Sequence, residues 1–259
     1  MKYCAAVFIG ILSLGGLLSC GLEAYYYIDY IPLSDYRVSS SAINLPSSSA
    51  EGYSTYFNNF VIFYRLYTSG TDFPSTVLTA DSRSAINATL NSDYNVLYSY
   101  TDTASTSVST ANLENTFDAR NYFKLTLEGV NINDVLGSQS LGRRLEIFFS
   151  TNNGEQPTLR LNGGTPYFLL RATEGQSRLF SPEPNRRFLN DPTLRDSAKA
   201  YPNATNINAD VVAAGSGETR YTYVSMYIAA SGISLEMPPQ TIYSQPTFIG
   251  IFRLANSGS

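Results

Sequence analysis

The chain has 259 residues, 43% of them hydrophobic, a formal net charge of −4, and no histidine or tryptophan. The hydrophobic content is enough for a packed core, so the chain is not globally disordered. The absence of histidine excludes a Ser-His-Asp triad, a histidine-ligated zinc site and an imidazole proton shuttle. The acidic balance argues against a nucleic-acid partner, which needs clustered Lys and Arg, and no motif indicates a cofactor.

The first twenty residues have the features of an export signal. Lys2 precedes an apolar run from Ala5 to Leu18, and the small residue Ser19 and then Cys20 follow that run directly. A positive start, a short apolar centre and a small residue before the cleavage site define a secretory signal. The run is shorter than the roughly 20 apolar residues of a spanning helix. We therefore expect residues 1–19 to be a signal peptide.

The end of this signal resembles the lipobox of bacterial lipoproteins. The residues that carry the resemblance are Leu17-Leu18-Ser19-Cys20. In that family the cysteine receives a diacylglyceryl group, a peptidase cleaves before it, and the new amine is acylated. The resemblance thus implies lipidation of Cys20 and a membrane partner, held through N-terminal acyl chains. A plain signal peptide with an incidental Cys20, or an uncleaved anchor, is the alternative.

Cysteine content is consistent with lipidation. Cys4 would depart with the signal and Cys20 would carry lipid, which leaves no thiol, disulfide or cysteine nucleophile in the mature chain. The short tether and the 20 tyrosines are similar in character to spirochaete surface lipoproteins. We expect the outer membrane or the cell surface rather than the inner membrane.

The first part of the mature chain, residues 20–56, is expected to be a lipid-anchored tether with a first strand. Residues 25–31 are rich in tyrosine and isoleucine, which favours a strand, with tyrosines at the lipid interface as the alternative. Residues 34–55 are polar and rich in serine, which predicts a loop. Residues 57–67 form the strongest strand pattern and are apolar on both faces, as in a covered central strand.

The rest of the chain, residues 57–259, is expected to be a β-sandwich with one short helix. Helical spacing of apolar residues predicts the helix at 79–98, followed by an exposed loop at 101–110. Alternation and turn residues predict strands at 122–127, 145–149, 158–161, 166–171, 221–228 and 248–254. Strands without alternating helices favour an all-β, mainly antiparallel sandwich. It comprises one or two Ig-like or jelly-roll-like units, with a sub-boundary near 101–119 left open.

Two groups of residues are candidate binding sites. Tyr221, Tyr223 and Tyr227 share one face of a predicted strand and could present an aromatic platform. The alternative for them is cross-strand packing. Arg186 and Arg187 form a small basic patch that could hold an anionic sugar or a phosphate, or could instead pair with nearby acids.

Enzymatic and metal-binding motifs are weak. Glu174, Glu183, Asp191 and Asp196 could supply two carboxylates for glycoside chemistry, but no spacing selects a pair. Asn206, Asn208 and Asp210 have the opening spacing of a calcium loop, but Val211 stands where that loop needs glycine. We therefore expect no catalytic or metal site, and a binding or adhesion module for a protein or glycan ligand. An envelope carbohydrate hydrolase, or a structural subunit that assembles through strand edges, is the alternative.

Overall fold

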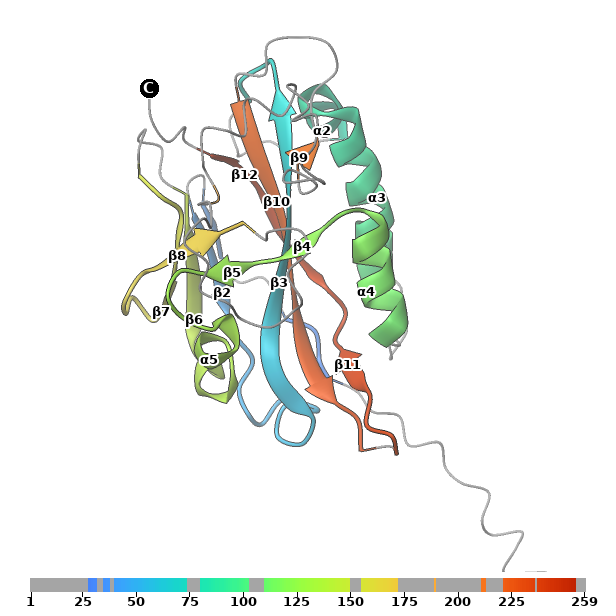
Figure 1. The fold of residues 1–259 in the computed structure, drawn as a ribbon, viewed down its shortest axis with the longest axis vertical. Coiled ribbons are helices and arrows are strands. Elements are labelled where there is room, and N and C mark those ends of the chain that lie inside the picture. The colour runs from blue at the N-terminus through green and yellow to red at the C-terminus, as the bar shows by residue number, and fades with distance from the viewer. Residues whose placement is uncertain are drawn as a thin grey trace, which may run out of the picture.

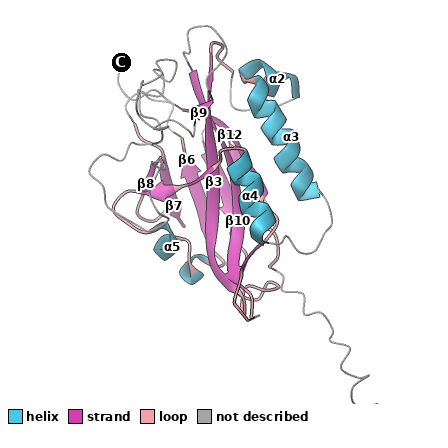
Figure 2. Cartoon of the chain, turned by 45° about the vertical axis from the view of Figure 1, so that its right-hand side comes forward, coloured by secondary structure: helices cyan, strands magenta, loops and turns pink. Residues whose placement is uncertain are grey.

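The computed structural model describes residues 28–31, 35–37, 40–73, 80–102, 110–149, 155–171, 189, 211–212, 221–235 and 237–254. Their strands form two mostly antiparallel sheets that face each other, and helices cover the outer side of one sheet (Figures 1 and 2). The expected all-β, sandwich-like fold is confirmed.

The first sheet has six strands. In spatial order they are β1 (Asp35–Arg37), β2 (Ser40–Asn44), β6 (Arg144–Phe148), β7 (Thr158–Leu161), β8 (Tyr167–Leu170) and β5 (Thr126–Leu127). The expected hairpin of β7 and β8 is present. The loop predicted over residues 34–55 is wrong, because β1 and β2 lie there. Pairing of β2 with β6, rather than local apolar content, makes this serine-rich segment a strand.

The second sheet is built around two long strands, β3 (Phe57–Ser69) and β10 (Tyr221–Ile233), which pair along almost their whole length. On its other edge, β10 pairs with β12 (Thr247–Leu254) and β11 (Thr241–Tyr243). On its other edge, β3 pairs with β4 (Phe123–Lys124) and β9 (Val211–Val212). The prediction of a central, covered strand at 57–67 is confirmed by β3.

The strand predicted at 122–127 is divided between the sheets. β4 pairs with β3 in the second sheet, whereas β5 pairs with β8 in the first. Leu125, which joins them, is buried, and its amide donates to the carbonyl of Ile62. In Figure 1 this green segment crosses from one sheet to the other. It therefore closes one side of the sandwich.

Side-chain alternation along β3 and β10 creates two apolar layers. Ile62 and Leu66 point with Val224 and Ile228 into the core between the sheets, where they meet residues of the first sheet such as Ile147. Residues that precede 101–119 and residues that follow it contribute to this same core. The opposite faces of β3 and β10 form a second layer beneath the helices.

The helices are more numerous than expected. They are α2 (Ala80–Ile86), α3 (Ala88–Asp102), α4 (Thr110–Ala119), α5 (Ile132–Val135) and the 3₁₀ helix η1 (Ser138–Ser140). The helix predicted at 79–98 is present but interrupted at Asn87, whose side-chain oxygen accepts from the Thr89 amide at 3.0 Å, as an N-cap does. α4 falls in the region predicted as a loop or sub-boundary. It packs on the second sheet through Leu113 and Phe117.

The segment that enters the fold, Ile28–Ile31, does not form the strand expected at 25–31; residues 25–27 lie outside the described part. Ile28 and Ile31 are buried, and the Asp29 carbonyl accepts from the Tyr53 hydroxyl at 2.7 Å. The Ile31 carbonyl accepts from the Thr247 hydroxyl. Much of the expected tether, from Ile28 onward, is therefore part of the packed domain.

Gly232 makes this entry possible, and its substitution should be destabilising. A Cβ at Gly232 would lie 2.2 Å from the Tyr56 carbonyl oxygen and 2.6 Å from Ile28 Cδ1. Because the Tyr56 carbonyl also accepts from the Ile233 amide, it cannot move freely. We expect Gly232→Ala to lower the free energy of unfolding by about 1–3 kcal/mol, measured by urea denaturation. The half-exposed neighbour Ile233 gives the control Ile233→Ala, and an equal loss in both variants would contradict the steric argument.

Candidate functional site

The three candidate tyrosines lie on one face of β10, as predicted, but helices cover that face. Tyr223 and Tyr227 are 1% and 0% exposed, and Tyr221 is half-buried. The Tyr223 hydroxyl accepts from the Phe73 amide at 2.7 Å, so it ties β10 to the chain after β3. The expectation of an exposed platform is therefore wrong for Tyr223 and Tyr227. Alternation predicts which residues share a face, but not what covers it.

Tyr227 lies at the centre of an aromatic cluster between the second sheet and α4. Its ring is 5.5 Å from that of Phe117, 5.7 Å from that of Tyr122 and 5.0 Å from that of Phe248. Phe117 also stacks on Phe63 at 4.3 Å. These edge-on and stacked contacts fix α4 on the sheet.

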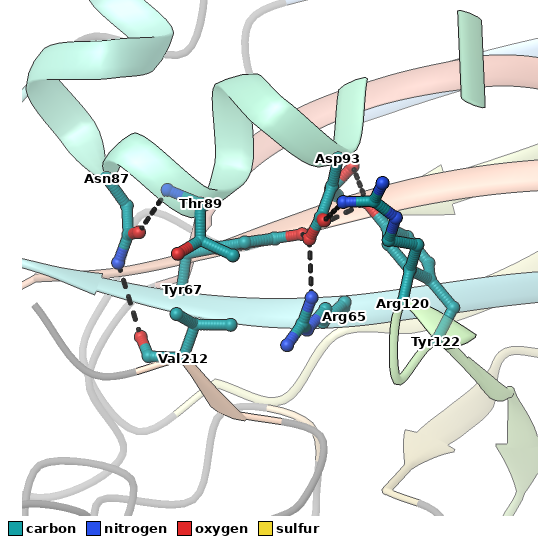
Figure 3. A network of polar contacts seen from close by, with 9 residues as sticks. Arg65, Tyr67, Asn87, Thr89, Asp93, Arg120, Tyr122 and Val212 are labelled. Carbon is teal, nitrogen blue, oxygen red and sulfur yellow. Dashed lines mark hydrogen bonds and ion pairs between the residues drawn. The ribbon is translucent and has the colours of Figure 1, made fainter. Parts of the chain in front are cut away.

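Beside this cluster lies a buried ionic network centred on Asp93 of α3 (Figure 3). The Asp93 side chain is 1% exposed and faces two guanidinium groups. Arg65 Nη1, from the middle of β3, donates to Asp93 Oδ2, and Arg120 Nη1 donates to Oδ1 at 3.3 Å. The Arg65 side chain is 10% exposed, whereas that of Arg120 is 33% exposed. Asp93 thus joins α3, β3 and the residue that follows α4.

A row of hydroxyl groups continues the network under the helices. The Tyr67 hydroxyl donates to Asp93 Oδ2 at 2.7 Å and lies 3.2 Å from the Tyr122 hydroxyl. The Tyr122 hydroxyl donates to Ser225 Oγ at 3.0 Å. Burial is the main cause that raises the pKa of Tyr67 and of Tyr122 well above that of a free tyrosine, and Asp93 adds to both shifts. Both phenols therefore stay neutral at physiological pH.

The chemistry of this network indicates a structural role. A neutral phenol with a raised pKa is a poor base near pH 7, and the Asp93 carboxylate is already bonded to three donors. With 1% of its side chain exposed, Asp93 presents no surface to a substrate. The network stabilises the position of the helices on the sheet rather than providing an active site.

Two charged residues in apolar surroundings indicate this network from the sequence. Arg65 interrupts the otherwise apolar middle of β3, and Asp93 lies between Leu90 and Leu97 at helical spacing. A charge on a covered face must be paired to be tolerated. An arginine and an aspartate on two covered faces therefore indicate a buried pair.

The other candidate residues cannot be placed. Cys20, Arg186, Arg187, Glu174, Glu183, Asp191, Asp196, Asn206, Asn208 and Asp210 lie outside the described residues. Within the described ranges, no group of three His, Cys, Asp or Glu residues could hold a metal ion. None of the described helices is long and apolar enough to span a membrane.

No family model, no curated protein and no solved structure matches this chain.

Proposed function

We propose that the chain is a membrane-anchored envelope lipoprotein whose β-sandwich domain binds a protein or glycan ligand at the outer membrane or cell surface. The observation that carries the anchor is the sequence Leu17-Leu18-Ser19-Cys20 at the end of the apolar run. The structure supports a short tether, because the packed domain begins by Ile28, eight residues after Cys20.

Four of the described acids are already paired with cations, which favours a binding role over catalysis at those positions. Asp93, Glu114, Glu146 and Asp72 each lie within 3.3 Å of a cationic side chain. Acids that are already paired are poor candidates for glycoside chemistry, which needs two carboxyl groups facing the substrate. No observation on the described residues favours the hydrolase or the assembly subunit.

The outer face of the first sheet is a better candidate ligand surface than the tyrosines. Phe148 of β6 and Phe168 of β8 are partly exposed there, on either side of Thr158 in β7. Arg160 of β7 lies over the Phe148 ring at 5.1 Å. Aromatic and arginine side chains together are typical of binding hot spots.

Lipidation at Cys20 can be tested with a matched pair of cysteine variants. Cys4 and Cys20 are the two cysteines of the chain, and both lie in the signal region. In cells fed an alkyne-tagged palmitate, we expect the wild type and Cys4→Ser to be labelled and Cys20→Ser to lose the label, because its hydroxyl cannot form the thioether. Label that persists in Cys20→Ser, or a wild type without label, would contradict the proposal.

A further inference from the structure

The turn between β10 and β11 exposes an apolar tip. Hydrogen bonds from the Ser234 amide to the Gln240 carbonyl, at 2.8 Å, and from the Gln240 amide to Ser234 Oγ, at 3.1 Å, close the base of the turn. Beyond this base, Leu235 is 65% exposed and Met237 is 98% exposed, and Ile233 before it is 49% exposed. Three large apolar side chains at one tip leave apolar surface in water that burial elsewhere would stabilise.

This tip is at the end of the domain where the tether enters. Ile28 packs against Gly232, the residue before Ile233. In Figure 1 the β10–β11 hairpin lies at the lower end of the molecule, while the opposite ends of β3 and β10 lie at the top.

Chain length limits how far the tip can be from the lipid anchor. The eight residues from Cys20 to Ile28 span at most about 29 Å when fully extended. β3 and β10 each have 13 residues and are roughly 40 Å long at ~3.3 Å per residue. An inverted domain would hold Ile28 farther from the bilayer than the tether reaches. The tip, in contrast, can reach the headgroups with the tether partly extended.

We propose that the tip of the β10–β11 hairpin inserts Leu235 and Met237 into the interface of the bilayer that holds the anchor, and thereby orients the domain. This inference rests on the proposed lipidation of Cys20. Residues 233–240 contain no lysine or arginine and one glutamate, so the contact is apolar rather than electrostatic and needs no anionic lipid.

The absence of tryptophan from the chain provides a site-specific test. In the acylated full-length protein, Met237→Trp places a single indole at the tip, and Leu235→Trp provides a second reporter. Thr71→Trp is the control, because Thr71 is exposed and follows the opposite end of β3. Each variant is reconstituted into phosphatidylcholine vesicles with and without brominated acyl chains, and indole emission is recorded.

We expect blue-shifted emission and quenching by brominated chains for Trp at 237 and 235, and neither for Trp at 71. Vesicle-bound protein with unshifted, unquenched emission from all three variants would overturn the insertion while leaving lipidation intact. Quenching of all three would overturn the orientation. A blue shift without quenching would mean that the tip is buried against another protein molecule, which also overturns the proposal. Protein that does not carry acyl mass at all would instead refute the proposed function.

Discussion

Replacing Asp93 by leucine is expected to lower the free energy of unfolding by about 3–5 kcal/mol, because it leaves the buried guanidinium of Arg65 without its carboxylate. The Tyr67 hydroxyl loses its acceptor at the same time. Denaturation of the purified variant in guanidinium chloride, followed by circular dichroism, measures the loss. Asp118→Leu is the matched control, because Asp118 is an exposed aspartate on α4.

A double substitution separates the cost of the unpaired charge from the contribution of the pair. Arg65 Nε has no hydrogen-bond partner among the described residues, so the arginine is incompletely satisfied even in the wild type. We expect Arg65→Met combined with Asp93→Leu to recover most of the stability lost in Asp93→Leu, as apolar replacements of buried pairs often do. Additive losses in the double variant, or a loss in Asp93→Leu no larger than in Asp118→Leu, would show that the network does not hold α3.

Phe117→Ala is expected to be similarly costly, with a loss of about 3–5 kcal/mol in the free energy of unfolding. Phe117 is fully buried and contacts the rings of Phe63, Tyr122 and Tyr227. Truncation would leave a cavity between α4 and the second sheet, and rigid β-strands can close it only in part. Guanidinium denaturation again provides the measurement.

Asn115→Ala is the control for Phe117→Ala, since Asn115 is exposed on the same helix and its replacement should change stability by less than about 0.5 kcal/mol. If Phe117→Ala were as mild as Asn115→Ala, α4 would not be packed on the sheet as described. The helical layer would then contribute little to the stability of the domain.

Sequence patterns predicted the elements whose own residues are enough to indicate a strand. β3 is apolar on both faces because the first sheet covers one face and helices cover the other. The side chains of β10 and β12 likewise point alternately into the core between the sheets and into the layer beneath the helices. The β7–β8 hairpin has turn residues between two apolar runs. In each case the apolar pattern of the strand itself predicts that the strand is buried.

Elements that depend on distant partners were missed. β2 is a strand because β6 pairs with it, and its serines give no local indication. α4 has few apolar residues, and Leu113 and Phe117 contact the sheet four residues apart, so the helical stripe is too short to stand out. The break at Asn87 depends on an amide side chain that caps α3 and donates to the Thr68 carbonyl of β3 at 3.4 Å.

The candidate sites show the same division. The shared face of Tyr221, Tyr223 and Tyr227 was predictable from alternation, but its cover by α2, α3 and α4 was not, because the helices arrive from another part of the chain. Arg65 and Asp93 each indicate a buried charged partner from their apolar surroundings, but their pairing with each other requires knowing that β3 lies beneath α3. Residues that define a site through tertiary contact are not recognisable from spacing within one element.

The account depends most on the fate of Cys20, and intact mass spectrometry of the protein isolated from membranes tests it most directly. We expect a mature chain that begins at Cys20 and carries the mass of a diacylglyceryl group with further acylation of the amine. A chain that retains Met1, or one with an unmodified Cys20 thiol, would contradict the account.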